Sequence, residues 1–482
     1  MIDPAQFAAA QSGRVISGQI AANMADIEAL NKALTAGYGT DVAGLTGGGA
    51  LRLQSLDKTL MAVIQENKHF ALFNRLPKPN ATATVDEWTE QSGIGGFLGG
   101  STNSELGIIQ ESTGEYARRT GFVKYLMTKR QVSLVQTLQG AMVEAEAIEQ
   151  QNGAKQLLTD AEYLCFEGDA SVVETEFDGI AAQVASLGST DHVIDLQGAT
   201  LTDMASIANA AATIAGYGNF GTPTDLFMAP MLGADMDANL DPAYRVVLPN
   251  GQPSQRGTPV KGLVTAQGDI SITRDVFVRD EALKTPFQLR HGAIAAANAF
   301  TPQSVTTDAT VSDASSQFTS GNAGNYYYFV TGVNANGQST GVMTAQVAVA
   351  AGKKVTLTIT ASVANTETGY VVYRSRKNGT NATNEVREMA RIAKAGGTTT
   401  YTDLNRDIPG TTSAYLLNLS PGDNAINWRQ LLPMLKFPLA TTNQAVIPWA
   451  QLMFGYLRIA KRRHHVWIKN IVPAGAKWKP FA

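Results

Sequence analysis

The longest regular pattern of apolar and polar positions in the chain lies between residues 141 and 167 and predicts a single helix. Its apolar positions recur at spacings of three, four and seven, which places them on one helical face: Ala147, Ala154, Leu158, Ala161 and Cys165. Acidic residues crowd the first turns, and Gly168 follows at the position of a left-handed C-cap. At ~1.5 Å per residue the helix is roughly 40 Å long. Alone, such a pattern is typical of an ordinary core helix.

Two helical segments precede it. In residues 1–50, which we interpret as an N-terminal arm, apolar residues keep helical spacing from Ile16 to Leu34. This arm has one apolar face and no local partner, so we expect it to dock elsewhere. Residues 51–79 predict a further helical segment, which stops at two prolines and leads into the next part of the chain.

Residues 80–120 predict a long hairpin arm. A segment that alternates like a strand is followed by the glycine-rich sequence SGIGGFLGGSTNSELG and by a second extended segment. A hairpin that cannot bury its faces is marginal in water, so we expect the arm to lie on a neighbouring subunit. A mobile lid over an active site is the alternative, which is disfavoured because the sequence offers no catalytic group for a lid to cover.

The remaining chain predicts an α+β protein interrupted by an all-β insert. Residues 121–230 and 231–299 alternate short strands and helices. Residues 300–414 contain successive alternating strands with Asn-Gly turns, which predicts a β-sandwich, and residues 415–482 return to an α+β pattern. In the sequences YFVTGVNANGQS and GYVVYRS, the insert resembles immunoglobulin-like or fibronectin type III modules.

Composition and charge exclude several classes of protein. The 38 basic and 41 acidic residues are interspersed and give a formal net charge of −3, which argues against a cationic nucleic-acid-binding arm. No run approaches the ~20 apolar residues of a membrane span, and the N-terminus lacks the pattern of a signal peptide. We therefore expect a cytoplasmic protein with no membrane partner. The single cysteine, Cys165, lies on the helical face and is expected to be a small buried apolar residue.

Candidate catalytic and metal-binding residues are sparse. His464 and His465 are adjacent and would point in opposite directions on a strand, and the other three histidines have no carboxylate or cysteine at ligand spacing. The glycine-rich residues 95–100 lack the ending of a phosphate-binding loop. The basic run from Lys461 to His465 is expected to be a solvated strand end, with contact to DNA or to a neighbour's acidic residues as the alternative. We expect no enzyme activity, no metal and no cofactor.

The order of these parts resembles a tailed-bacteriophage major capsid protein of the Hong Kong 97 fold. The resemblance covers everything outside the insert and is carried by the N-terminal arm, the segment LRLQSLDKTLMAVIQENKHFALFNRLPK, the glycine-tipped hairpin, the long helix ending in CFEGD, and the closing LLPMLKFPLA and FGYLRIAKRRHHVWIKNI. It implies that residues 141–167 are the spine helix of a peripheral domain, 121–230, and that residues 80–120 are the extended loop. Residues 231–299 and 415–482 would then form the axial domain, with the chain's end returning to the peripheral domain.

The function that this resemblance implies is self-assembly, as hexamers and pentamers, into an icosahedral head that encloses double-stranded DNA without sequence-specific binding. The candidate partners are further copies of the chain and portal, scaffolding and decoration proteins, and assembly would take place in the cytoplasm of the host bacterium. The loop tip carries no lysine, so we expect no lysine–asparagine crosslink of the kind that some members form. An encapsulin-like compartment, or an adhesin or carbohydrate-binding protein that does not assemble, are the alternatives.

Seven residues are candidates for subunit contacts, and all but the leucine are aromatic residues or arginines, which are enriched at protein interfaces: Trp88, Phe97, Leu98, Arg118, Arg119, Trp428 and Arg429. For Trp88 and Trp428, a place in the core is an equally good interpretation. The spine helix should pack its apolar face on the sheet of its own domain. Its polar face and Gly153 would remain for the shell interior or a neighbouring arm, and Gly153 is also the expected position of a bend.

Overall fold

The computed structural model describes residues 66–109, 111–138, 145–201, 204–238, 260–280, 299–441 and 444–481. The predicted N-terminal arm and most of the helical segment after it lie outside these residues. No helix in the described ranges is long and apolar enough to span a membrane.

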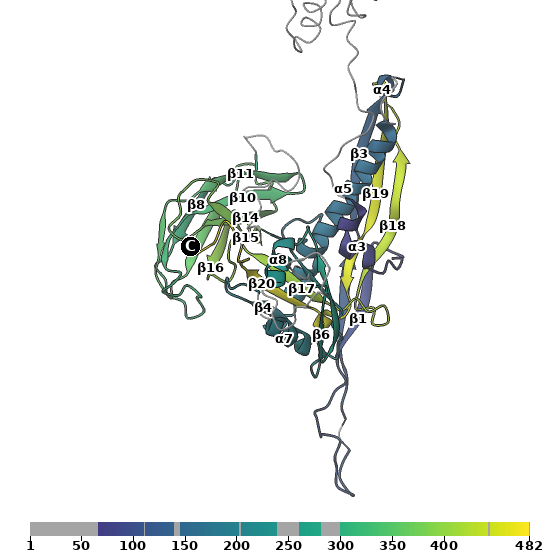
Figure 1. Cartoon of the computed structure of the whole chain (residues 1–482), viewed down its shortest axis with the longest axis vertical. Coiled ribbons are helices and arrows are strands. Elements are labelled where there is room, and N and C mark those ends of the chain that lie inside the picture. Colours follow the sequence, from purple (N-terminus) through teal and green to yellow (C-terminus); the bar gives the residue numbers. More distant parts are fainter. Residues whose placement is uncertain are drawn as a thin grey trace, which may run out of the picture. The chain divides into compact units, whose positions relative to one another are not determined.

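A long helix on a three-stranded antiparallel sheet is the largest unit of the fold (Figure 1). Helix α5, Ala145–Glu167, lies along strand β3, Lys124–Ser133, and contacts β19, Val446–Ile459. Strand β18, Ile426–Pro438, pairs with the other edge of β19. The helix that the apolar spacing predicts is thus confirmed to its C-terminal residue, and its expected first residues, 141–144, lie outside the described ranges.

The face that α5 buries differs from the predicted one. Its buried residues are Gly153, Leu157, Ala161, Glu162, Cys165 and Phe166. Cys165 is fully buried, as expected, but Ala147 is exposed and Ala154 and Leu158 are only partly buried. The expectation that Gly153 faces outward is wrong, because a Cβ there would lie 2.0 Å from Oε1 of Gln451 on β19. The glycine lets the helix approach the sheet closely.

Gly168 ends α5, but not as a left-handed cap. It is absent from the described residues with a positive φ angle. Its backbone N–H donates to the carbonyl of Leu164 at 2.9 Å, and a Cβ would lie 2.3 Å from the carbonyl oxygen of Phe177. Glycine is required here because another backbone segment passes too close for a side chain.

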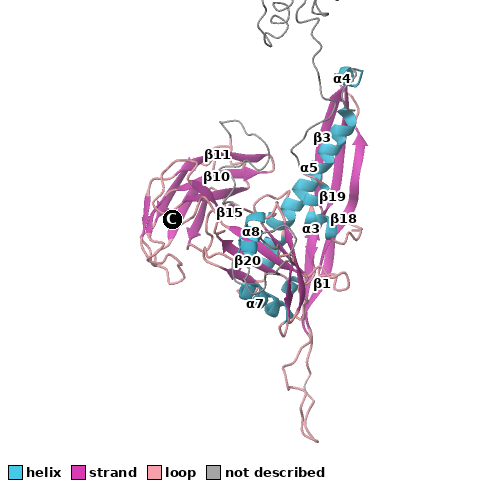
Figure 2. Ribbon diagram, viewed as in Figure 1, coloured by secondary structure: helices cyan, strands magenta, loops and turns pink. Residues whose placement is uncertain are grey.

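Short elements surround this unit (Figure 2). The first described elements are η1 and α3, and the hairpin of β1 and β2 follows them. Helix α4 follows β3, and helix α6 follows α5. Their bounds are η1 Asn67–His69, α3 Ala71–Arg75, β1 Val85–Gly93, β2 Glu115–Phe122, α4 Leu134–Leu138 and α6 Ile180–Ala185.

A six-stranded mixed sheet contains strands from both sides of the predicted insert. Its order is β4-β20-β17-β5-β7-β6. Strand β17, which begins within the last three residues of the predicted insert, pairs with β5, which precedes the insert. Helices α7 and α8 pack their apolar residues against this sheet. The bounds are β4 Val193–Asp195, β5 Asp225–Met228, β6 Gly262–Thr265, β7 Gly268–Arg274, β17 Thr412–Leu417, β20 Val466–Ile471, α7 Met204–Ala215 and α8 Pro230–Ala238.

Strands β8 to β16 form a β-sandwich with its own apolar core. One sheet has the order β11-β10-β14-β15, the other has the order β16-β13-β8, and β9 pairs with β12. The bounds are β8 Ser304–Asp308, β9 Gly324–Tyr326, β10 Tyr328–Asn334, β11 Gly337–Met343, β12 Val347–Val349, β13 Val355–Thr360, β14 Gly369–Ser375, β15 Val386–Ala393 and β16 Thr398–Asp403. The likeness to immunoglobulin-like modules and the boundaries proposed for each part stay predictions.

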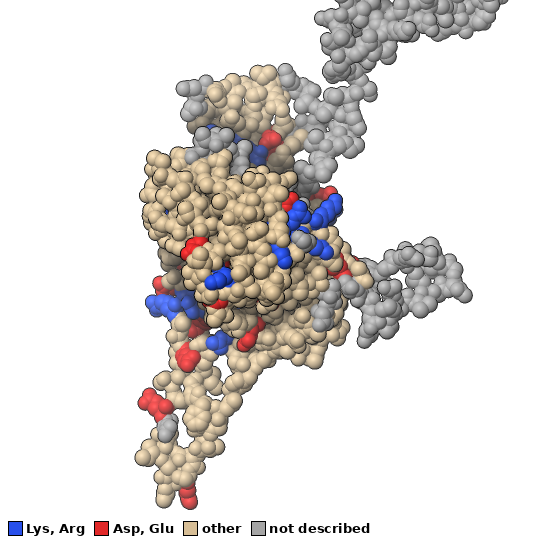
Figure 3. Space-filling model, turned by 90° about the vertical axis from the view of Figure 1, so that its left-hand side faces the viewer, with Lys and Arg blue, Asp and Glu red and all other residues tan. Residues whose placement is uncertain are grey.

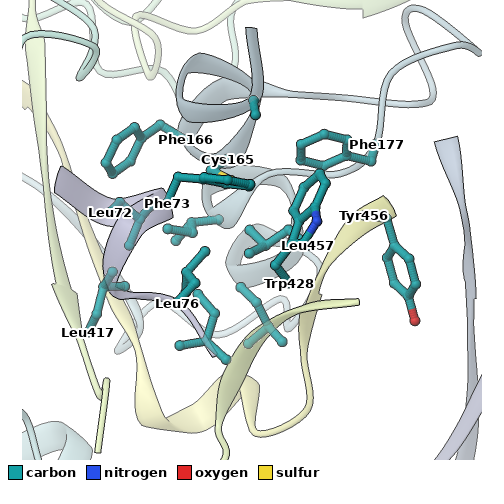
Figure 4. Close-up of a cluster of buried hydrophobic side chains, with 14 of the residues drawn as sticks. Leu72, Phe73, Leu76, Cys165, Phe166, Phe177, Leu417, Trp428, Tyr456 and Leu457 are labelled. Atoms are coloured by element: carbon teal, nitrogen blue, oxygen red, sulfur yellow. The ribbon is translucent and has the colours of Figure 1, made fainter. Parts of the chain in front are cut away.

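The main core lies where α3, α5 and the two host sheets meet (Figure 4). The indole of Trp428 packs edge-on against Phe73, at 5.1 Å between ring centroids, and against Phe177, at 5.3 Å. Phe166 of α5 contacts Phe227 and Tyr415 of the six-stranded sheet. This core joins the spine helix to both sheets and holds the base of the hairpin in place.

Candidate assembly surface

The hairpin of β1 and β2 ends in an apolar tip that has no partner among the described residues. The two strands pair from Val85 opposite Phe122 to Gly93 opposite Glu115, and the tip lies beyond this ladder. In Figures 1 and 2 the tip stands clear of the other described elements. Its large apolar side chains are almost fully exposed: Ile94, Phe97, Leu98, Leu106, Ile108 and Ile109. Exposed apolar residues gathered in this way mark an interaction site.

The tip is also acidic. Glu105 and Glu111 lie in it, Glu115 borders it at the end of the ladder, and no lysine or arginine occurs between Lys78 and Arg118. Figure 3 shows acidic but no basic side chains at the end of the lower projection. A partner surface for the tip should therefore be apolar and basic.

The face of the three-stranded sheet that points away from α5 is a second exposed apolar surface. Strand pairing places Tyr125 opposite Phe454, Met127 opposite Leu452, and Leu452 opposite Leu435 of β18. Tyr125 and Phe454 pack edge-on at 4.9 Å, and Phe437 continues this row on β18. Tyr125, Met127, Leu435 and Phe437 are each exposed by about half. We call this surface the open sheet face.

An arginine cluster lies at one end of the same face, where the hairpin begins. Asp86 on β1 accepts hydrogen bonds from Arg429 at 2.8 and 3.1 Å and from the Tyr456 hydroxyl at 2.6 Å, and Arg458 lies 3.6 Å from it. Trp88 lies two residues after Asp86 on β1, and the Arg458 guanidinium lies over its ring.

A second carboxylate continues the cluster. Glu90 pairs with Arg119 and with Arg462, both at 3.0 Å. Two carboxylates thus face four guanidinium groups. Burial and the neighbouring Arg429 lower the pKa of Arg458, as expected where positive charge is in excess.

The seven sequence candidates fall into different environments. Phe97 and Leu98 lie in the tip, at 77% and 75% exposure, and Arg118 is exposed with a 3.4 Å pair to Glu87. Trp88, Arg119 and Arg429 belong to the arginine cluster. Trp428 is fully buried in the main core, which is not compatible with a direct subunit contact, so the core interpretation holds for it. The candidates therefore come together in two places, the tip and the root of the hairpin.

Sequence reasoning did not single out the residues of the open sheet face. Tyr125, Met127 and Phe437 lie in segments for which only an α+β pattern was predicted. The available signal was the sequence YLMTKRQV, in which both alternating faces carry large side chains, although a strand packed on one side usually alternates apolar with polar.

The basic run is not a solvated strand end, and this prediction was wrong. Its central part forms the 3-10 turn η3, Arg462–His464, in which Arg462 and His464 are buried, and the next residue, His465, is fully buried. The Asn418 side-chain amide contacts His464 Nδ1 at 3.1 Å, and the Asn418 N–H donates to His465 Nδ1 at 3.3 Å. Burial lowers the pKa of His465 to about 3, so this imidazole is neutral in the folded chain.

The part of the chain that the structure describes holds no group of three or more His, Cys, Asp or Glu residues placed to bind a metal ion. The two buried carboxyl groups that do meet, Glu162 and Asp275, lie in the main core rather than in a cleft. The loop tip, the open sheet face and the arginine cluster are suited to binding another protein surface through apolar contacts and charge pairing.

No family model matches the chain. The chain is 26% identical over 463 residues to a putative major capsid protein of Enterococcus phage phiEF24C, covering 92% of this chain and 95% of that protein. Among solved structures it is similar to the capsid of a native GTA particle, with 9% identity, 90% and 100% coverage and a TM-score of 0.45. It is also similar to a chain of Mycobacterium phage Ogopogo, with 10% identity, 89% and 99% coverage and a TM-score of 0.44.

The described residues combine a long helix on an antiparallel sheet, a long hairpin, and a mixed sheet whose strands precede and follow a β-sandwich, which is the order of parts expected from the resemblance to the Hong Kong 97 fold. The similarity to the phage protein runs through almost the whole of both chains. The chain is accordingly similar to a putative phage major capsid protein.

Proposed function

We propose that the chain assembles, as hexamers and pentamers, into the icosahedral head of a tailed phage and that this shell encloses double-stranded DNA. The homology to a phage capsid protein supports the shell and its place in the virion. Assembly occurs in the host cytoplasm, and portal, scaffolding and decoration proteins are further proposed partners.

The observation that carries this proposal is the match between the loop tip and the open sheet face. The tip is apolar and acidic, whereas the open sheet face is apolar and ends in an arginine cluster with surplus positive charge. The tip of a chain cannot reach its own cluster, because the β1–β2 ladder carries it away from Asp86 by seven residues at ~3.3 Å each, or roughly 23 Å. We infer that the tip of one copy lies on the open sheet face of the next.

Contacts of this kind suit a shell. Each one buries a modest area, but every subunit gives one tip and receives one, so the contacts add up around a closed assembly. The near-neutral net charge of −3 fits DNA that is confined by a wall rather than bound through its phosphates.

The test is assembly of purified chains, measured by sizing chromatography and electron microscopy. The wild-type chain should form hexamers, pentamers or shells. The double variant Ile108→Asp, Ile109→Asp should stay unassembled with unchanged thermal unfolding, because both side chains are exposed in the single chain. Met127→Asp, on the open sheet face, should have the same effect.

Val363→Asp is the matched control, since Val363 is equally exposed but lies in the β-sandwich region. It should assemble normally. Normal assembly of the tip variant would contradict the contact, whereas a wild-type chain that stays monomeric under all conditions would contradict the shell itself. Particles recovered from infected cells should contain nuclease-protected DNA; particles that hold protein cargo instead would favour an encapsulin-like compartment.

A further inference from the structure

The two central strands of the four-stranded sheet of the β-sandwich, β10 and β14, are buried on both faces. Every residue of β10 and of β14 is buried. Alternate residues, among them Tyr328 and Val372, face the sandwich core. The residues between them, Phe329, Val371 and Tyr373, form a second cluster together with Val172 and Val173. An appended module would leave one of these faces to solvent, with polar side chains on it.

Val172 and Val173 belong to the turn that follows the spine helix. The hydroxyl of Thr368, just before β14, donates to the carbonyl of Val172 at 2.7 Å. At Gly369, a Cβ would lie 2.7 Å from Cγ1 of Val172, so the sandwich backbone and this turn are in close contact. The insert is thus packed on the end of α5 without a gap.

Arg391 of β15 reaches the C-terminal turn of α5. Its Nη1 donates to the carbonyl of Glu167, the last residue of the helix, at 3.0 Å, and its Nη2 donates to the hydroxyl of Tyr163. Glu388 fixes the guanidinium through Nε at 2.8 Å. The last carbonyls of a helix lack partners within it and carry partial negative charge, so a buried cation at this position both satisfies and stabilises the helix end.

The C-terminal residues of the chain hold the other side of the sandwich. Trp478 donates from Nε1 to the carbonyl of Glu385 at 3.1 Å, and the guanidinium of Arg387 lies 5.2 Å from the Trp478 ring. The N–H of Lys377 donates to the carbonyl of Pro480 at 2.8 Å. The insert therefore contacts two segments that are far apart in sequence, the end of α5 with its following turn and residues 478–480.

We propose that the inserted sandwich is the C-terminal cap of the spine helix, with Arg391 as the residue that couples them. The inserted domain is then a structural part of the subunit's frame rather than an appendage. This inference does not depend on shell formation, because it concerns contacts within one chain.

Hydrogen exchange of the full-length chain tests it, with wild type and variants compared in the same oligomeric state. In Arg391→Ala, amides in the last two turns of α5, residues 161–167, should exchange at least tenfold faster, while β13 in the sandwich core keeps its protection. Arg406→Ala is the matched control, since Arg406 is an exposed arginine whose hydrogen bond, to the carbonyl of Ser315, stays within the insert. It should leave residues 161–167 within twofold of wild type.

Exchange within twofold of wild type in a folded Arg391→Ala chain would overturn the proposal. If the Arg391→Ala chain aggregates, the same exchange measurement on Arg391→Lys tests the proposal instead. It keeps the charge and loses the two-pronged contact to Glu167 and Tyr163, so a several-fold acceleration confined to residues 161–167 is expected. Unchanged exchange in Arg391→Lys would equally overturn the cap.

Discussion

At the scale of single residues, two carboxyl groups are buried together in the main core. Glu162 of α5 accepts the backbone N–H groups of Leu72 and Phe73, both at 2.7 Å, and faces Asp275, which accepts the N–H of Phe277 at 2.8 Å. Burial and the neighbouring Asp275 raise the pKa of Glu162 to about 9, and burial also raises the pKa of Asp275. The pair therefore holds a proton at neutral pH, while Lys78 and Cys165 lie nearby.

This pair should make stability fall as pH rises. The folded chain keeps a proton that the unfolded chain releases near the ordinary pKa of 4.5, so the pair stabilises fully below that value and loses its contribution as pH approaches 9. Asp275→Asn removes one of the two acids and supplies an amide that can donate to Glu162. It should stabilise the chain by about 1.5–3 kcal/mol at pH 9, the scale of a hydrogen bond to a charged group.

Urea unfolding at pH 5, 7 and 9 measures this effect. The difference between Asp275→Asn and wild type should widen with pH, whereas Asp191→Asn, at an exposed position, should follow wild type throughout. A difference that is constant with pH would contradict the shared proton.

At the scale of elements, Gly153 sets how closely the spine helix lies on its sheet. The Gln451 side chain of β19 fills the space above it and donates from Nε2 to the carbonyl of Gln150 at 2.7 Å. The nearest other atom to a Cβ at this position would be Cγ of Arg130, at 3.4 Å. Gln451 is thus the main obstacle to a larger residue.

Gly153→Ala should destabilise the chain by about 1–2 kcal/mol. Alanine gains ~1 kcal/mol in helix propensity, but overpacking a buried contact costs about 1–3 kcal/mol and the Gln451 hydrogen bond is lost as well. Gly153→Ala combined with Gln451→Ala should recover stability, because the obstacle is removed. A double-mutant cycle from urea unfolding measures this coupling; additive effects would show that Gln451 is not the obstacle.

At the scale of the whole molecule, Asp86 joins the root of the extended loop to strands more than 340 positions later in the sequence. Burial acts to raise its pKa, but hydrogen bonds from Tyr456 and Arg429 outweigh burial and hold the pKa below its ordinary value. The stability that Asp86 supplies is therefore present above the ordinary pKa of 3.8 and is lost as pH falls through the lowered pKa.

Asp86→Asn should destabilise the chain by about 2–3 kcal/mol at pH 7, because Arg429 and Arg458 lose their shared counter-charge. The loss should shrink below pH 4, where wild-type Asp86 becomes protonated as well. Limited proteolysis should show faster cleavage in the extended loop. Glu87→Gln, which removes only an exposed pair with Arg118, is the control and should behave as wild type.

The helices and strands could be predicted from the sequence more reliably than the contacts of their side chains. The spine helix, the hairpin and the interruption by β-strands have strong local periodicity, so they could be predicted from residue spacing. The buried face of α5 could not, because Gly153 and Glu162 look like surface residues until their partners on β19 and α3 are known. The basic run was misread for the same reason, since Glu90 and Ser186, the partners of Arg462, are remote in sequence.

For the insert, a signal was present but not used. The sequences YYYFV and YVVY are continuous apolar runs, which is the pattern of strands covered on both sides. They indicate that these two strands of the sandwich are covered on both faces by other parts of the chain.

The pairing of β3 with β19 fixes the order in which a newly made chain can fold. Leu126 of β3 lies opposite Met453, 327 positions later in the sequence, so the sheet beneath the spine helix cannot close until those further residues have been translated. At about 5–20 residues per second, the first strand waits roughly 16–65 s for its partner. The sandwich strands need only local partners and can form earlier. Meanwhile the apolar loop tip is already outside the ribosome, so the time of greatest risk of aggregation falls before the subunit is complete.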